Sequence, residues 1–283
     1  MEQATDPRTR VLISVDEVLA RLDTPAAPQL LDVRWRLGEV AGSGLERYRQ
    51  RHLPGARFLD LEAVLTGPHT DPRQGRHPLP SPEQVAHGLG ELGIDPGREI
   101  VVYDEPGSFA AGRAWWVLRW LGLNARVLDG GLTAWQAAGA PLQTGLPEPA
   151  VPSRIGPLTA GHLATLTADQ VALFEGTLID VRAPERYRGE TEPIDARAGH
   201  IPEAVNRPVS GFWDDRGQLP GQATLRGRLD LTEDRPVAVY CGSGISAAQV
   251  VLALASLGLD AALYPPSWSG WSSDPDRPVA VGQ

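Results

Sequence analysis

The sequence of 283 residues contains a single cysteine, Cys241, and therefore no intrachain disulfide. A lone thiol suits a reducing compartment such as the cytosol. Basic residues number 26 against 35 acidic ones, and the formal net charge of −9 argues against nonspecific nucleic-acid binding, which requires an excess of cations. No apolar run reaches the roughly 18 residues of a membrane span, and the charged N-terminus lacks the apolar core of a secretory signal. We therefore expect a cytoplasmic protein with neither a nucleic-acid nor a membrane partner.

The chain instead has the composition of an ordinary globular protein, with 42% hydrophobic and 22% charged residues. Its length fits two domains. An internal repeat supports this division: LLDVRW at residues 30–35 returns as LIDVRA at 178–183, and RHLPGA at 51–56 returns as GHIPEA at 199–204, both 148 positions later. IVVYDEPGSFAAG at 100–112 matches VAVYCGSGISAAQ at 237–249 with an offset of 137. Landmarks in the same order in both halves indicate a tandem duplication.

A stretch rich in proline and glycine, residues 139–157, separates the two copies and shows no periodicity. Proline stiffens the chain and removes hydrogen-bond donors, so this stretch is typical of a semi-extended linker. We expect domains at residues 1–145 and 159–283, joined by a linker at residues 146–158.

Short β-branched runs alternate with helical patterns in both halves. The helical patterns are SPEQVAHGLGELG and SAAQVVLALASLG, and both end on glycine, as helices often do. Alternation of this kind predicts an α/β fold in which each domain is a parallel sheet with helices on both faces. The expected strands are Val11–Val15, Leu30–Val33, Ile100–Tyr103, Leu178–Val181 and Val237–Tyr240.

Cys241 directly follows the apolar run VAVY and precedes a helix that begins near Ser246. The intervening loop is built from glycine and other small residues, so its backbone N–H groups can turn inward and form a cradle for an anion. The positive end of the helix favours the thiolate, which is the nucleophilic form of cysteine. In the first half the matching position is Asp104, and an acid would be a poor substitute in a packed core. The pattern predicts a reactive cysteine.

Two chemistries use a cysteine in such a loop. A cysteine phosphatase needs an arginine six positions later to bind the phosphoryl oxygens, and here that position is Ala247. Sulfur transfer requires only that the thiolate accept a sulfane sulfur and become a persulfide, whose charge the amides of the loop would stabilise. Sulfur transfer is therefore favoured, with no metal or cofactor. The cradle is expected from residues 242–247, which include Gly242, Gly244, Ile245, Ser246 and Ala247.

These stretches, together with VVYDEPGSFAAGRAWWVLRWLG and DGGLTAW, resemble the tandem-domain rhodanese family, the thiosulfate and 3-mercaptopyruvate sulfurtransferases. In that family the C-terminal domain carries the nucleophile, and the N-terminal domain is a degenerate copy with aspartate in its place. The resemblance implies two rhodanese-like α/β domains, with Cys241 as the persulfide carrier and Asp104 as its degenerate counterpart.

The loop CGSGIS is similar to that of mercaptopyruvate-type members, in which an aliphatic residue and Ser or Thr follow CGSG. The resemblance implies that Ser243 acts with His77 and Asp60 of the other domain in a relay that protonates the departing enolate. It also implies that Arg186 binds the donor's carboxylate. The family's second arginine aligns with Ile194, so we expect the carboxylate to be bound either by Arg186 alone or with the help of Arg197 nearby.

The donor is thus expected to be an anionic sulfur compound, with thiosulfate as the alternative to 3-mercaptopyruvate on the same nucleophile. The acceptor is expected to be cyanide, a small thiol or a thioredoxin-like protein. An interpretation from another class is a noncatalytic sulfur carrier or interaction module.

Overall fold

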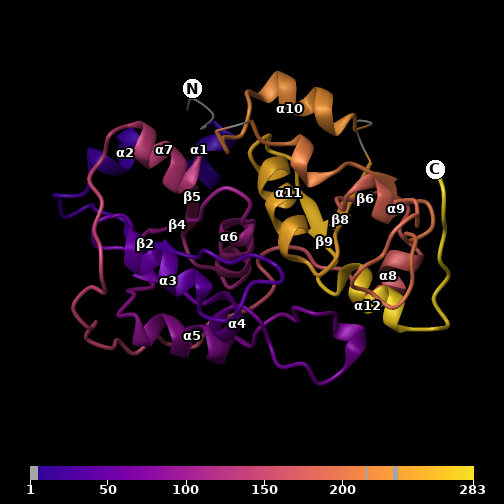
Figure 1. The fold of residues 1–283 in the computed structure, drawn as a ribbon, viewed down its shortest axis with the longest axis horizontal. Coiled ribbons are helices and arrows are strands. Elements are labelled where there is room, and N and C mark those ends of the chain that lie inside the picture. The colour runs from indigo at the N-terminus through magenta and orange to yellow at the C-terminus, as the bar shows by residue number, and fades with distance from the viewer. Residues whose placement is uncertain (1–5, 215, 232–234) are drawn as a thin grey trace.

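The computed structural model describes residues 6–214, 216–231 and 235–283 and contains two parallel β-sheets, one in each half of the chain. Figure 1 shows the two halves side by side, with the N-terminal sheet among indigo and magenta helices and the C-terminal sheet among orange and yellow ones. The α/β fold with two similar domains agrees with the sequence prediction.

The N-terminal sheet has five strands in the order β1-β5-β4-β2-β3. All of its pairs are parallel, and β4 occupies the centre with all four side chains buried. Continuous burial explains why β4 reads as an unbroken apolar run rather than an alternating one. The strands are β1 Leu12–Ile13, β2 Gln29–Asp32, β3 Arg57–Phe58, β4 Ile100–Tyr103 and β5 Ala125–Leu128.

The C-terminal sheet repeats this arrangement with four parallel strands in the order β7-β6-β8-β9. A single bridge from Thr165 to Leu263 stands at the edge where β1 stands in the first sheet. The central strand β8 is again fully buried. The strands are β6 Thr177–Asp180, β7 Val205–Asn206, β8 Val237–Tyr240 and β9 Ala261–Leu263.

Helices connect the strands, and polar side chains fix where several of them begin. Ser81 accepts a hydrogen bond from the backbone N–H of Gln84 at 3.1 Å, and Pro82 opens the helix behind it. The N-terminal helices are α1 Pro7–Val11, α2 Val15–Leu19, α3 Ser43–Gln50, α4 Leu61–Val64, η1 Pro72–Gln74, α5 Pro82–Glu91, α6 Ala110–Trp120 and α7 Gly131–Ala137. The C-terminal helices are α8 Ala168–Ala172, α9 Pro184–Tyr187, η2 Val209–Gly211, α10 Gln222–Leu229, α11 Ile245–Ala255 and α12 Ser267–Ser273.

The expected first strand is shorter than predicted. Only Leu12–Ile13 pairs with β5, because Ser14 ends the strand and begins α2. Its hydroxyl accepts from the N–H of Glu17 at 3.2 Å, while the Glu17 carboxylate accepts from the N–H of Ser14 at 3.0 Å. This reciprocal pair is a capping box, which the apolar pattern of residues 11–15 does not reveal.

The two halves pack through α6 and α11, which lie against each other between the sheets (Figure 1). Gly112 of α6 allows the close crossing, because a Cβ there would lie 2.7 Å from the Cα of Gln249. The largest apolar core contains residues of both halves. Between α7 and α8 the chain runs over the N-terminal half, where the N–H of Ser153 donates to the carbonyl of Gly90 at 2.9 Å.

Candidate active site

Cys241 lies at the turn between β8 and α11, where the sheet meets the interface between the halves. Its Sγ accepts a hydrogen bond from the N–H of Gly244, with 3.1 Å between N and Sγ. Gly244 has φ of +83°, and a Cβ at this position would lie 2.5 Å from the carbonyl oxygen of Pro265. The turn therefore requires glycine, and it points at least one loop amide at the sulfur.

Helix α12 holds the loop from behind. The Ser267 hydroxyl accepts from the N–H of Cys241 at 3.1 Å and lies 4.0 Å from Sγ. The N–H groups of Trp268 and Ser269 donate to the carbonyls of Cys241 and Gly242, each at 2.9 Å. These bonds occupy the carbonyls of Cys241 and Gly242, while the sulfur contacts the Gly244 amide and the Ser267 hydroxyl. Cys241 is only 2% exposed, so its side chain is buried at the base of the loop.

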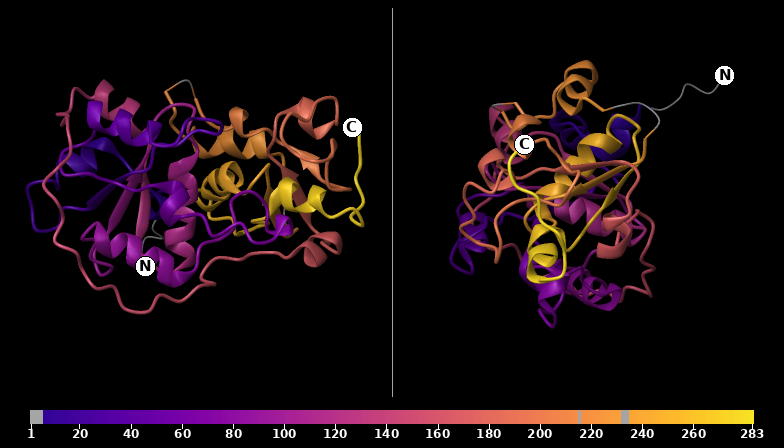
Figure 2. Two further views of the ribbon diagram at one scale, coloured as in Figure 1. Left: turned by 60° about the horizontal axis from the view of Figure 1, so that its bottom comes forward. Right: turned by 90° about the vertical axis from the view of Figure 1, so that its right-hand side faces the viewer.

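A loop of the N-terminal half, residues 65–80, carries Arg76 and His77 to this site. We call it the bridging loop. Figures 1 and 2 show it reaching beneath α12 of the other half. Gly75, with φ of +80°, permits the contact, because a Cβ there would lie 2.4 Å from the carbonyl oxygen of Pro266. The N–H of Arg76 donates to the Ser269 hydroxyl at 3.1 Å. The site is therefore made by both domains.

His77 is buried, and its ring contacts a carboxylate and an indole of the N-terminal half. Its Nε2 lies 3.2 Å from Oε1 of Glu62, and its ring meets that of Trp35 edge-on, with centroids 5.1 Å apart. Burial lowers the pKa of His77, and the Glu62 carboxylate opposes that effect. The contact with His77 in turn lowers the pKa of Glu62. Nδ1 of His77 is buried without a hydrogen-bond partner among the described residues.

Asp60, the acid expected beside His77, does not contact it in the structure. Asp60 is exposed and caps α4, with Oδ1 accepting from the N–H groups of Glu62 and Ala63 at 2.9 and 3.1 Å. The carboxylate in contact with His77 belongs to Glu62, two residues later. Ser243 is buried beside the cysteine at 6% exposure, and its participation stays a prediction. Of the remaining loop positions, Ile245 and Ala247 are buried on α11, and Ser246 is half-buried.

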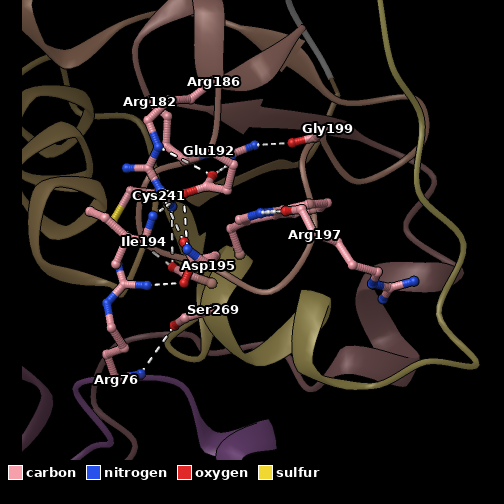
Figure 3. Close-up of polar contacts among 12 residues, drawn as sticks. Arg76, Arg182, Arg186, Glu192, Ile194, Asp195, Arg197, Gly199, Cys241 and Ser269 are labelled. Atoms are coloured by element: carbon pink, nitrogen blue, oxygen red, sulfur yellow. Dashed lines mark hydrogen bonds and ion pairs between the residues drawn. The ribbon is translucent and has the colours of Figure 1, made fainter. Parts of the chain in front are cut away.

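Arg186 lies over the cysteine loop, with its guanidinium fixed by acidic residues of its own half. Nη2 donates to Oε1 of Glu192 at 2.7 Å and to Oδ2 of Asp195 at 3.0 Å (Figure 3). Arg76 approaches from the other domain and pairs with Oδ1 of the same Asp195. A Cβ on Gly242 would lie 3.0 Å from Nη2 of Arg76 and 3.6 Å from Nη1 of Arg186. Two guanidinium groups therefore face the loop that carries Cys241.

The prediction that Arg197 is the second anion-binding arginine is not supported by the geometry. Figure 3 shows its side chain extending away from Cys241. Its guanidinium donates to the backbone carbonyls of Trp271, Ser272, Asp274 and Arg277 at 2.6–3.2 Å. These bonds occupy its donors, so Arg197 holds the end of α12. Arg76, next to His77 in GRHPLP, is the arginine that sequence reasoning missed.

The degenerate loop of the N-terminal half has the same turn filled with carboxylates. Asp104 replaces the cysteine, and its Oδ2 accepts from the N–H of Ala111 at 3.0 Å. Glu105 stands at the position of Gly242, and its carboxylate pairs with Arg47. Arg47 is the counterpart of Arg186, because each precedes a tyrosine whose ring stacks on a histidine. The ring centroids are 4.0 Å apart for Tyr48 and 3.8 Å apart for Tyr187.

A buried arginine of α6, Arg113, lies behind the cysteine loop. Its Nη1 would be 3.4 Å from a Cβ on Gly244, and its Nη2 donates to the carbonyl of His77 at 3.0 Å. Burial lowers its pKa to about 10, and the negative charge of a Cys241 thiolate opposes that shift. The counterpart of Arg113 in the other half is Val250. An arginine within an otherwise apolar helix was therefore a signal in the sequence that the sequence analysis missed.

Comparison with known proteins identifies the family. The rhodanese-like domain matches twice, at residues 14–138 and 160–274. "Putative thiosulfate sulfurtransferase SseB" of Mycobacterium tuberculosis is 45% identical, covering 97% of this chain and 98% of that protein. The 3-mercaptopyruvate sulfurtransferase of Escherichia coli K12 is 35% identical, covering 96% of this chain and 98% of that one. The crystal structure of SseA from Escherichia coli superposes with a TM-score of 0.80 at 32% identity, over 91% of this chain and 98% of that one.

Two similar α/β domains, with a cysteine at the strand–helix turn of the second, define the class of protein as a sulfurtransferase. The chain belongs to the rhodanese family, with one rhodanese-like domain in each half. Its activity is the transfer of a sulfur atom. No helix within the described ranges is both long enough and apolar enough to cross a membrane.

Proposed function

We propose that this sulfurtransferase takes its sulfur from 3-mercaptopyruvate. The Cys241 thiolate attacks the donor's sulfur, and the bond between that sulfur and carbon 3 breaks. Its electron pair leaves with the carbon as the enolate of pyruvate. The proton of the donor's thiol is transferred in net terms to that carbon, so the products are pyruvate and the anionic persulfide. The reaction balances without an added oxidant or reductant, and the Gly244 amide is placed to stabilise the persulfide charge.

The observation that carries the donor assignment is the carboxylate in the degenerate loop. Glu105 extends from the counterpart of Gly242, and its carboxylate forms ion pairs with Arg36 and with Arg47, the counterpart of Arg186. The active loop has glycine there instead, so the corresponding space beside Arg186 has no carboxylate supplied by the loop. A donor with its own carboxylate fits this position, and arginine binds carboxylates through paired N–H groups. Thiosulfate has no carboxylate.

Proton transfer to the enolate is assigned to His77, with Glu62 in place of Asp60 as the orienting acid. Nε2 of His77 lies 3.2 Å from Glu62, and Nδ1 has no hydrogen-bond partner among the described residues, so Nδ1 is the nitrogen to which we assign the proton transfer. The lowered pKa of His77 keeps the ring neutral at pH 7, so one nitrogen can accept a proton and deliver it in turn. Ser243, next but one to the nucleophile, is the proposed link between ring and donor.

The acceptor that removes sulfur from the persulfide is proposed to be cyanide, a small thiol or a thioredoxin-like protein. Each is a nucleophile that attacks the outer sulfur and regenerates the thiolate. A reducing cytoplasm suits this cycle, since the chain has one cysteine and no second thiol to resolve it.

The test is to mix the protein with 3-mercaptopyruvate and measure its intact mass before and after cyanide. We expect one added sulfur that cyanide removes, and no addition to the Cys241→Ser variant. The same measurement with thiosulfate is the comparison, because the name of the Mycobacterium tuberculosis relative gives that donor. Faster loading from thiosulfate than from mercaptopyruvate would refute the donor assignment but leave the nucleophile in place.

A further inference from the structure

The carboxylate of Asp195 lies between two arginines that come from different domains. Its Oδ2 accepts from Arg186 of the C-terminal half at 3.0 Å, and its Oδ1 pairs with Arg76 of the bridging loop. The Asp195 side chain is only 4% exposed. One carboxylate therefore engages both guanidinium groups, each through a different oxygen.

The position of this carboxylate is what connects it to the reaction. Both guanidinium groups lie within 3.6 Å of the place where a side chain on Gly242 would begin. Gly242 follows the nucleophile directly. Nε of Arg76 is also buried without a hydrogen-bond partner among the described residues, so this arginine has an unused donor. The nitrogens nearest that place are Nη2 of Arg76 and Nη1 of Arg186, whereas Asp195 binds Nη1 of Arg76 and Nη2 of Arg186. An incoming carboxylate beside Cys241 would therefore meet the same two guanidinium groups that now bind Asp195.

Glu192, on the same segment, has a different relation to Arg186. It accepts from both Nε and Nη2, at 3.2 and 2.7 Å, and so fixes the plane of the guanidinium. Asp195 accepts from that same Nη2 through Oδ2, and its Oδ1 pairs with Arg76. The two acids are thus distinguishable by geometry: Glu192 orients Arg186, whereas Asp195 occupies the gap between the arginines.

We propose that Arg76 and Arg186 form a clamp across the domain interface for the donor's carboxylate, and that Asp195 is a resident carboxylate which competes with the donor for these two guanidinium groups. Arg76 thereby fills the place of the second anion-binding arginine, which Ile194 does not supply and Arg197 does not reach. Because Asp195 offsets the positive charge of both guanidinium groups, it sets how strongly a carboxylate-bearing donor binds. The proposal rests on the proposed function for the identity of that donor.

The test measures KM and kcat for 3-mercaptopyruvate in four variants. We expect Asp195→Asn to lower KM about fivefold or more, because a neutral amide competes less well for the arginines. Arg76→Gln should raise KM about tenfold or more. Glu192→Gln should also raise KM, since Arg186 loses its orientation. Arg73→Gln is the matched control on the same loop, because its side chain is exposed and Asp71 is its one ion-pair partner among the described residues, and KM should not change.

The combination of variants separates competition from a structural role. In the Arg76→Gln background, Asp195→Asn should lower KM by a smaller factor than in the parent protein, because the two residues interact. A rise in KM for Asp195→Asn would overturn the proposal, since Asp195 would then position the arginines rather than compete. An unchanged KM for Arg76→Gln would overturn it as well.

Failure of the donor assignment is distinguishable from failure of the clamp. If mercaptopyruvate does not load Cys241 in the parent protein, the proposed function is wrong, and the clamp is tested by calorimetric titration of pyruvate into the Cys241→Ser protein. Tighter binding in the added Asp195→Asn variant and weaker binding in Arg76→Gln would support the clamp. Equal binding in both, or no heat with Asp195→Asn at any pyruvate concentration, would overturn it.

Discussion

Replacing Asp104 by asparagine tests the electrostatics of the degenerate loop. Burial raises the pKa of Asp104 from 3.8 to about 7, against the lowering effect of its hydrogen bond from the N–H of Ala111. A carboxyl with a raised pKa in the folded state resists ionisation there. It therefore costs stability at every pH at which the unfolded chain is already ionised.

The size of that cost follows from the shift. About three pKa units at 1.36 kcal/mol each give a ceiling of about 4 kcal/mol above pH 7. Asp104 borders a cavity of about 190 Å³, also lined by Gln249 and Trp213, and is not completely enclosed. Water in that cavity would solvate the carboxylate, so we expect a cost of about 1–3 kcal/mol. Asparagine keeps an oxygen for the Ala111 N–H and removes the charge.

Asp104→Asn should therefore raise the free energy of unfolding by about 1–3 kcal/mol at pH 8. The gain should shrink as the pH falls through about 7 and vanish near pH 4, where the acid is protonated in both states. Urea unfolding at pH 4.5, 6 and 8 measures it. Asp60→Asn is the control, because that carboxylate also caps a helix but is exposed. A loss of stability at pH 8, or a gain independent of pH, would refute the reasoning.

Three further predictions concern the interface and the site. Gly112→Val places a side chain against the backbone of Gln249 and should lower the free energy of unfolding, measured with urea, by about 2–4 kcal/mol. An unchanged free energy would mean that α6 and α11 can move apart without cost. Gly244→Ala strains the turn at φ of +83° and displaces the amide from Sγ, so persulfide loading, followed by mass, should slow about tenfold or more. Loading at the parent rate would contradict this. Glu62→Gln removes the carboxylate that raises the pKa of His77, so the ring should titrate at lower pH by NMR, whereas an upward shift would disprove the contact.

Much of the architecture was predictable because its causes are local. The runs Ile100–Tyr103 and Val237–Tyr240 were predicted with the bounds that β4 and β8 have. Both strands are central and buried on both faces, so their sequences are continuously apolar. The expected strand at the start of the chain was too long, since its end depends on a capping box rather than on apolar residues.

The relay acid was harder to predict because two carboxylates lie two positions apart. Asp60 turns its oxygens toward the first N–H groups of α4, which cap the helix. Glu62, in the first turn of that helix, then projects toward His77. Which of the two carboxylates meets His77 depends on the residue at which the four-residue helix α4 begins. The sequence does not define that residue closely enough to decide between Asp60 and Glu62.

The sequence by itself determined the duplication, the α/β class and the loop that carries Cys241. These features depend on short-range order: apolar runs, a glycine turn, and the identity of one residue against its counterpart Asp104. Tertiary structure alone decided which arginines face the sulfur. A guanidinium binds whichever oxygens surround it. Arg197 donates to carbonyls in and just after α12, whereas Arg76 reaches from the other domain and pairs with Asp195. Those neighbours are distant along the chain, and only folding brings them together.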